Sequence, residues 1–337
     1  MTGKRPRTAK MPTPLQQRGQ KFVDALRGEA VEPAARRYLA DPRIGIALGG
    51  GSARGLVHIP YIEAIDELGL KPAVIAGCSI GALIGGGWAA GMRGRELREH
   101  SVAVLGTLRM IAGRIWNTHV GSGLFSLLRT GVPMQLDALK VVESFIPEKF
   151  PQTFEACSVP LYVVATDFQS WHQVAFNAGP LVPAIGGSIA IPTLFKPVAY
   201  ANHLLVDGGV VNPLPLDQIA GPDVDLTVGI DVNGDPSTAI GRTDFRPLDV
   251  WFGSAQIMMH SLIAHTMAAY PPDIYVRPHV NQFGPHEYWR IREILEVAAA
   301  EKDRFKHILA EKIEAFIAAR QRTIATDHPP GPRSGRK

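Results

Sequence analysis

Residues 73–85, with the sequence AVIAGCSIGALIG, determine how the surrounding chain folds. Residues 74–76 form an apolar run of the length of a buried strand, and residues 80–90 are apolar, uncharged and long enough for a helix. Between them, residues 77–81 have the pattern G-x-S-x-G, with Ser79 at its centre. A strand, a sharp turn and a helix with serine at the turn are typical of a nucleophile elbow. The positive end of the helix dipole would stabilise negative charge that develops beside the serine.

The two glycines of this pentapeptide, Gly77 and Gly81, suit a strained backbone and closely packed neighbours. The pentapeptide by itself is also compatible with a packing turn whose serine only caps the helix. Two further motifs favour the catalytic interpretation.

The first of these motifs is a glycine-rich turn nearer the N-terminus. The apolar run 44–48 predicts a buried strand that leads into residues 49–55, GGGSARG, and then into a helix. The N–H groups of such a loop can bind an anion. A nucleotide is disfavoured because no P-loop lysine is present, and the dinucleotide fingerprint fails because Arg54 stands where its last glycine belongs. A transient oxyanion is the favoured ligand, and a plain strand-to-helix turn is the alternative.

The second motif is residues 204–209, LLVDGG, in which Asp207 ends an apolar strand. This is a typical active-site position in an open α/β sheet, and the glycines after it allow another segment or a ligand to approach. Alone, the motif would indicate a hairpin turn.

Strands alternate with helices through residues 44–232, which predicts a three-layer α/β/α sandwich with a mostly parallel central sheet. Further helices are predicted at 93–113, 134–146 and 286–322, and further strands at 161–167, 172–176, 224–232 and 273–276.

In this order, the three motifs resemble those of the patatin-like phospholipases, and of the bacterial members most closely. The resemblance extends to residues 188–197, SIAIPTLFKP, which are similar to the proline-containing block of that family. It implies a patatin-like α/β fold with a Ser–Asp dyad, in which Ser79 is the nucleophile and Asp207 the general base. It also implies that the oxyanion is stabilised by backbone N–H groups of the glycine-rich loop, those of Gly49, Gly50 and Gly51. The supporting residues of the motifs are Ser52, Arg54, Gly55, Gly77, Gly81, Gly208 and Gly209, and we expect Arg54 to hold the loop by hydrogen bonding.

The function implied is that of an enzyme, a carboxylic ester hydrolase acting on phospholipid or lysophospholipid through an acyl-enzyme. The alternatives are a soluble esterase, an acyltransferase or thioesterase with the same dyad, and a non-catalytic lipid-binding scaffold. A catalytic triad ranks below the dyad, because none of the candidate histidines downstream of Ser79 lies in a recognisable turn. These candidates are His203, His260, His265 and His286. We expect no cofactor and no metal, since no metal-binding spacing occurs.

The distribution of charge argues against a nucleic-acid partner. Residues 1–10 and 331–337 carry seven basic and no acidic residues. Without those seven of the 35 basic residues, 28 remain against 31 acidic ones, so the body of the chain has no basic excess. The basic ends could contact anionic lipid.

The two cysteines, Cys78 and Cys157, form neither a disulfide framework nor a zinc motif, which favours a cytoplasmic location. Peripheral contact with the inner face of the membrane is compatible with a lipid substrate. The uncharged runs 72–92 and 250–272 reach the length of a bilayer span. We predict instead a strand, elbow and helix for the first and a core-facing helix for the second, so no transmembrane segment is expected.

Three regions are expected along the chain. Residues 1–43 would form a partly disordered N-terminal extension, residues 44–280 the catalytic domain, and residues 281–337 a helical segment with a disordered basic tail. Residues 113–130 are the candidate lid over the site.

Overall fold

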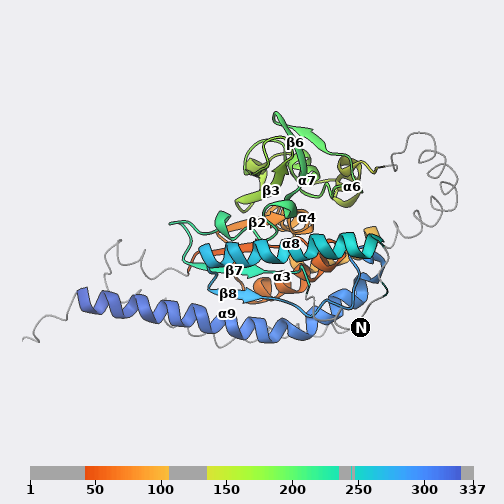
Figure 1. Ribbon diagram of the computed structural model, residues 1–337. Coiled ribbons are helices and arrows are strands. Elements are labelled where there is room, and N and C mark those ends of the chain that lie inside the picture. The colour runs from red at the N-terminus through yellow and green to blue at the C-terminus, as the bar shows by residue number, and fades with distance from the viewer. Residues whose placement is uncertain (1–41, 106–134, 235–243, 245–246, 328–337) are drawn as a thin grey trace, which may run out of the picture. The chain divides into compact units, whose positions relative to one another are not determined.

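The computed structural model describes residues 42–105, 135–234, 244 and 247–327 (Figure 1). The candidate lid, the basic tail and all but two residues of the expected N-terminal extension lie outside the described residues. Residues 42–313 form one compact unit, and the described residues 314–327 belong to a second unit. Every motif of the sequence analysis lies in the first unit.

One mixed sheet forms the centre of this unit, with the strand order β5-β6-β3-β2-β1-β7-β8 and with β4 also paired to β3. The described strands are β1 (Ile44–Leu48), β2 (Val74–Cys78), β3 (Leu161–Asp167), β4 (His172–Phe176), β5 (Val198–Tyr200), β6 (His203–Asp207), β7 (Leu226–Ile230) and β8 (Ile274–Val276). Pairing is parallel from β3 through β2, β1 and β7 to β8, and β4, β5 and β6 pair antiparallel. The expected parallel sheet is therefore confirmed, with an antiparallel edge added to it.

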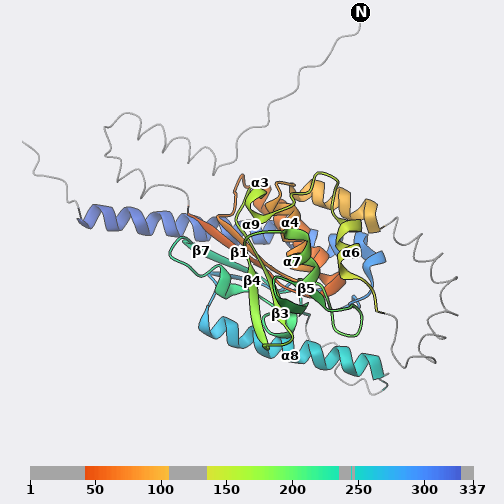
Figure 2. The same cartoon turned by 90° about the horizontal axis from the view of Figure 1, so that it is seen from above.

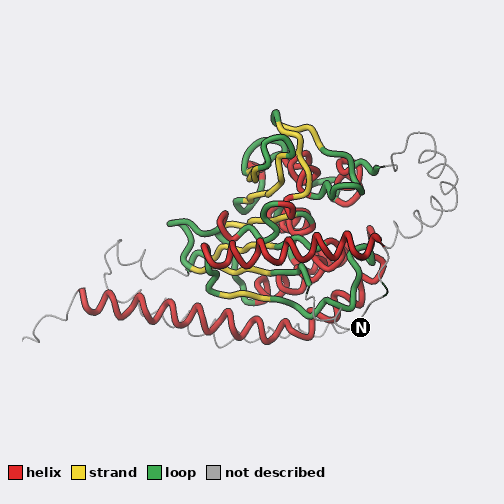
Figure 3. The backbone as a smooth tube through the Cα atoms, in the orientation of Figure 1, coloured by secondary structure: helices red, strands yellow, loops and turns green. Residues whose placement is uncertain are grey.

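Helices cover both faces of this sheet, as the sequence predicts. The longer ones are α3 (His58–Glu67), α4 (Ile80–Ala89), α6 (Ala138–Phe145), α7 (Leu181–Ser188), α8 (Pro247–Ala269) and α9 (Ile291–Asp327). Gly85 of α4 packs against Leu48 and Ile75, whereas Ala47 and Ala76 belong to a core cluster with Ile263 of α8. Neighbouring residues of a strand point to opposite faces, so α4 and α8 lie on opposite sides of the sheet (Figure 2). Figure 3 distinguishes the helices from the strands by colour.

Helix α8 confirms the predicted helix at 250–272 but corrects its expected burial. Most of the described side chains of α8 are at least partly exposed. Among these described residues, the buried apolar one is Ile263. The reason is that the turn after β6 already covers this face of the sheet, with Leu214, Leu216 and Ile219 in the same core cluster. No described helix is long and apolar enough to cross a bilayer.

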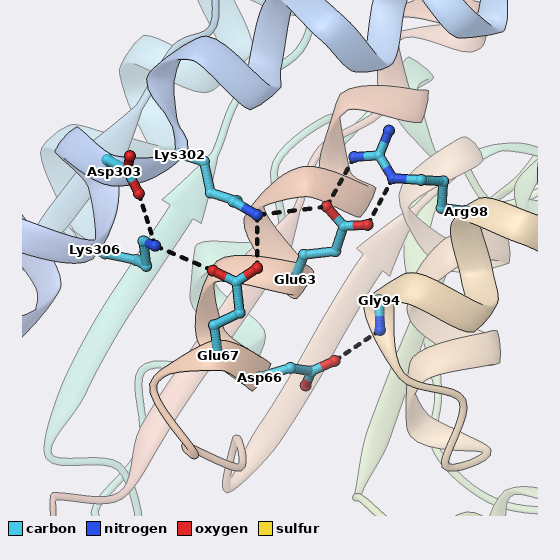
Figure 4. A network of polar contacts seen from close by, with 8 residues as sticks. All are labelled: Glu63, Asp66, Glu67, Gly94, Arg98, Lys302, Asp303 and Lys306. Atoms are coloured by element: carbon cyan, nitrogen blue, oxygen red, sulfur yellow. Dashed lines mark hydrogen bonds and ion pairs between the residues drawn. The ribbon is translucent and has the colours of Figure 1, made fainter. Parts of the chain in front are cut away.

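The beginning of α9 packs on α3, so residues 291–313 belong to the unit that holds the motifs. Tyr61 of α3 is buried, meets the ring of Phe305 edge-on at 5.1 Å and donates to Glu301 at 2.9 Å. A network of polar contacts, made by seven charged side chains and the N–H of Gly94, lies beside this contact (Figure 4). Its members are Glu63, Asp66, Glu67, Gly94, Arg98, Lys302, Asp303 and Lys306. The helix begins at Ile291 rather than at the predicted residue 286, because a 3-10 turn (Tyr288–Arg290) precedes it.

Candidate active site

Strand topology brings Ser79 and Asp207 together. Strand β2 pairs along one edge of β3 until Cys78 lies opposite Val164. Strand β6 runs along the same edge from the opposite direction and ends with Asp207 opposite Ala165, because β4 occupies the other edge of β3 from Val163 to Asp167. The two strand ends therefore meet head to head, and Ser79 follows directly after one of them.

The turn at Ser79 has the geometry of a nucleophile elbow. Its φ of 54° and ψ of −123° are uncommon for a residue other than glycine, and α4 begins at the next residue. A Cβ at Gly77 would lie 2.6 Å from the backbone of Ala82, and one at Gly81 would lie 2.1 Å from the carbonyl oxygen of Leu48. Both distances are far below van der Waals contact, which confirms that close packing requires glycine at these positions.

The two side chains are directly hydrogen-bonded. Ser79 Oγ donates to Asp207 Oδ2 at 2.6 Å, and the N–H of Gly209 donates to Asp207 Oδ1 at 2.7 Å. Ser79 is 5% and Asp207 is 7% exposed. Burial raises the pKa of Asp207 to about 6, and the hydrogen bonds from Ser79 and Gly209 offset part of that rise. The carboxylate is therefore a stronger base than an ordinary aspartate and is still largely ionised at neutral pH.

Neighbouring residues hold both members in place. The N–H of Ser79 donates to Ser188 Oγ at 2.8 Å, and the Ser188 hydroxyl donates to the carbonyl of Val164 at 2.6 Å. Thr166 Oγ1 donates to the carbonyl of Asp207 at 2.9 Å. Sequence reasoning placed Ser188 in the proline-containing block but assigned it no role, because its partners come from other strands.

The glycine-rich loop lies against the serine. A Cβ at Gly50 would stand 3.4 Å from both Ser79 Cβ and Cys78 Sγ. The Cys78 thiol is buried, and burial together with the charge of Asp207 raises the pKa of this thiol well above its usual value. The thiol stays protonated, as expected of a small buried side chain.

Two of the three loop glycines use their N–H groups within the fold. Gly49 donates to the carbonyl of Ile230 at 3.0 Å, and Gly50 donates to the carbonyl of Pro213 at 2.9 Å. These two N–H groups are therefore not free to bind an oxyanion in this structure. The N–H of Gly51 forms no hydrogen bond to any described residue.

The next residues complete and anchor this loop. Ser52 has a φ of 53°, and its N–H also has no hydrogen bond to a described residue. Arg54 donates from Nε to the carbonyl of Phe283 at 2.8 Å and from Nη1 to that of Asn233 at 3.0 Å. Arg54 therefore connects the loop to two distant segments by hydrogen bonds. Gly55 lies in the 3-10 turn η1 (Ser52–Val57) against α4.

Beyond Asp207, Gly208 and Gly209 form the 3-10 turn η3 (Gly208–Val210). A Cβ at Gly209 would lie 3.0 Å from Met259 Sδ, so this turn lies beside α8.

One buried histidine supports the loop although no spacing in the sequence singles it out. His58 Nε2 lies 2.8 Å from the carbonyl oxygen of Gly49. Burial lowers the pKa of His58 to about 4, so the ring is neutral and Nε2–H is the donor.

None of the downstream histidines bonds to Ser79 or Asp207 within the described part of the chain. They are His203, His260, His265 and His286. His203 contacts Asp167 at 3.1 Å, and His286 packs against Trp289. Among the described residues, no group of three or more His, Cys, Asp or Glu side chains could hold a metal ion.

Comparison with known proteins gives one family. The model of the patatin-like phospholipase family matches residues 46–220, a range that contains all three motifs. An uncharacterised NTE family protein of Mycobacterium tuberculosis is 37% identical over 204 residues, which are 60% of this chain and 53% of that protein. The chain thus matches about half the length of this relative.

Two more distant matches cover more of this chain. A lysophospholipase of Kluyveromyces lactis is 25% identical over 317 residues, covering 87% of this chain and 21% of that protein. The crystal structure of VipD from Legionella pneumophila matches 80% of this chain and 67% of its own, with 14% identity and a TM-score of 0.43.

Proposed function

This chain belongs to the patatin-like phospholipase family, and on that premise we propose that it is a serine lipid acyl hydrolase of the phospholipase or lysophospholipase type. The observation that carries the proposal is the 2.6 Å hydrogen bond between Ser79 Oγ and Asp207 Oδ2 at a strained elbow. A nucleophile and a base are already in contact there, so the site needs no third residue for proton transfer.

In the proposed acylation step, Ser79 Oγ attacks the carbonyl carbon of the ester while Asp207 Oδ2 accepts the hydroxyl proton. The pKa of Asp207 is about 2 units above that of an ordinary aspartate, so the free energy of proton transfer to this carboxylate is more favourable by ~3 kcal/mol. Asp207 then passes the proton to the oxygen of the leaving alcohol, and the acyl group remains on Ser79.

The oxyanion formed in this step needs hydrogen-bond donors beside the serine. We assign this role to the N–H groups of Gly51 and Ser52, because those of Gly49 and Gly50 are bonded within the fold. One well-placed donor contributes roughly 3 kcal/mol to stabilising such a transition state. The N-terminus of α4, which begins after Ser79, adds its dipole.

In the proposed second step, a water molecule takes the place of the alcohol. Asp207 accepts a proton from the water as its oxygen attacks the acyl carbon, and the proton returns to Ser79 Oγ when the fatty acid leaves.

The test is labelling with a fluorophosphonate, followed by peptide mass mapping and hydrolysis of phospholipid and lysophospholipid substrates. We expect an adduct on Ser79, and loss of hydrolysis in both Ser79→Ala and Asp207→Asn. Ser144→Ala, at an exposed serine of α6, is the matched control and should retain activity.

Other outcomes would replace the proposal. Cleavage of short-chain esters or thioesters without any lipid cleavage would favour the soluble esterase or thioesterase. A folded protein that forms no adduct would favour the non-catalytic scaffold.

We further propose that α8 contacts the lipid surface from which the substrate is taken. Residues 250–268 contain no charged side chain, and Ile257 and Met258 are 64% and 61% exposed. The helix lies beside the turn after Asp207, where Val210 is also exposed, so this apolar surface is continuous with the site.

Cosedimentation with vesicles of phosphatidylcholine and phosphatidylglycerol tests this contact. We expect the double variant Ile257→Glu, Met258→Glu to lose vesicle binding while it retains hydrolysis of a water-soluble ester. Equal vesicle binding by the variant and the wild type would contradict a role for α8.

A further inference from the structure

The residues that follow strand β7 support the glycine-rich loop. A Cβ at Gly51 would lie 2.5 Å from the carbonyl oxygen of Val232, and Arg54 Nη1 donates to the carbonyl oxygen of Asn233 at 3.0 Å. The family model matches residues 46–220, so this supporting segment lies outside the matched range. The positions of Gly51 and Arg54 therefore depend on how the segment after β7 is held.

One end of this segment is held by a buried carboxylate. The N–H of Asn233 donates to Asp231 Oδ1 at 2.9 Å, and the Tyr275 hydroxyl donates to Asp231 Oδ2 at 2.6 Å. Asp231 and Asn233 are both buried. These bonds fix the N–H of Asn233 relative to the sheet, whereas its carbonyl group is held from another direction.

That direction is α8, from which Gln256 forms two hydrogen bonds with Asn233. Gln256 Nε2 donates to the carbonyl oxygen of Asn233 at 2.7 Å, and Asn233 Nδ2 donates to the carbonyl oxygen of Gln256 at 3.0 Å. The Asn233 carbonyl oxygen thus accepts from Gln256 and from Arg54 at once, one donor for each lone pair. A Cβ at Gly234 would lie 2.8 Å from both Arg54 Nη1 and Gln256 Nε2, so the two side chains pack closely around the same peptide group.

Gln256 lies on the face of α8 that points into the protein. Met259 on this face places Sδ beside the turn η3, and Ile263 belongs to the core cluster under the helix. Spacings of three and four residues put these three side chains on one side of the helix, whereas Ile257 and Met258 are exposed. The link to the loop is therefore separate from the exposed apolar surface of α8.

We propose that Gln256 is a positioning residue of the active site, which acts through the Asn233 carbonyl and Arg54 to hold the glycine-rich loop where its oxyanion donors meet the reacting ester. This inference rests on the proposed acyl hydrolase function, and it links α8, the helix proposed to contact lipid, to those donors. An oxyanion forms only in the transition state, so a shift of the loop slows turnover without weakening substrate binding.

The experiment measures kcat and KM of Gln256→Met on a water-soluble ester. Methionine keeps the length of the side chain and its place in the helix but removes the donor, so packing and hydrogen bonding are separated. A single hydrogen bond corresponds to roughly a two- to tenfold effect. We expect kcat and the rate of fluorophosphonate labelling to fall by about threefold while KM stays within about twofold. Gln321→Met, the same replacement at an exposed position of α9, is the matched control and should leave both constants unchanged.

Two further variants test the route of the effect. Asn233→Ala removes the second hydrogen bond of the pair, keeps the N–H that bonds to Asp231, and should lower kcat to a similar extent. In an Arg54→Met background the loop has lost its bond to the Asn233 carbonyl. Adding Gln256→Met there should change the rate of fluorophosphonate labelling by less than about twofold, because the residue through which Gln256 acts is already absent.

Three results would overturn the inference: unchanged kcat in Gln256→Met, an effect on KM alone, or an equal loss of labelling rate in the Arg54→Met background. Failure of the proposed function is distinguishable, because it would appear as a wild-type protein with no adduct on Ser79 and no ester hydrolysis.

Discussion

Replacing Asp207 by asparagine should inactivate the protein and at the same time make it more stable. The wild-type carboxylate is ionised in a buried site, and burial opposes that charge. Asparagine has the same shape, and its carbonyl oxygen can still accept from the N–H of Gly209. The substitution therefore removes the unfavourable charge and keeps most of the packing.

The magnitude follows from the shift of the Asp207 pKa, from 3.8 to about 6 on folding. Because the folded pKa is raised, the native state binds more protons than the unfolded state between these two values, and the free energy of unfolding falls as pH rises through that window. Above pH 7 the full cost of about 3 kcal/mol is present, and at pH 5 about half of it. The free energy of unfolding of the variant should thus exceed that of the wild type by up to ~3 kcal/mol at pH 8 and by about half as much at pH 5.

Urea denaturation of both proteins at pH 5 and pH 8, followed by tryptophan fluorescence, measures this difference. Ser79→Ala is the control, because it is also expected to be inactive but keeps the buried carboxylate, so it should show no such gain. A stability difference between Asp207→Asn and the wild type that is zero, or equal at both pH values, would refute the reasoning.

The remaining predictions concern the base, the elbow and its support. The wild-type kcat/KM on a water-soluble ester should fall tenfold per pH unit below about pH 6, since the base must be ionised; a profile flat from pH 7 to pH 4 would contradict this. Gly81→Ala should abolish folding to soluble protein, because its Cβ would lie 2.1 Å from the carbonyl oxygen of Leu48, whereas Gly253→Ala on α8 meets no neighbour within 4 Å and should raise the free energy of unfolding by ~1 kcal/mol. Expression yield and thermal unfolding compare the two glycine variants. Ser188→Ala should lower kcat about tenfold with little change in KM, because the N–H of Ser79 loses its acceptor; steady-state kinetics with unaltered kcat would refute that role.

Much of the fold could be predicted because its signals are local. The predicted strands 44–48, 161–167 and 172–176 coincide with β1, β3 and β4, since each is an apolar or alternating run bounded by turn residues. The elbow at residues 77–81 could be predicted as well, because its pentapeptide lies between a strand-length run and a helix-length run. The steric need for glycine at position 77 comes from the adjoining helix, whereas that at position 81 comes from Leu48 of β1.

The parts that could not be predicted depend on residues far apart in the chain. The N–H of Gly49 is bonded to Ile230, a residue of β7 with no local relation to the loop. Arg54 of the same loop donates to the carbonyl of Phe283, a residue more than 200 positions further along the chain. The exposure of apolar side chains on α8 also depends on distant residues, since the turn after β6 covers that face of the sheet.

The sequence by itself determined which residues are the candidate nucleophile and base, because a serine in a strand-turn-helix pentapeptide and an aspartate at a strand end are local patterns. Tertiary structure alone decided that Ser79 and Asp207 lie 2.6 Å apart, that the pKa of the aspartate is about 6, and which N–H groups of the glycine-rich loop stay free. The physical reason is that desolvation and hydrogen-bond occupancy are set by every atom packed around a group, and strands β2, β3, β6 and β7 bring those atoms from distant parts of the chain.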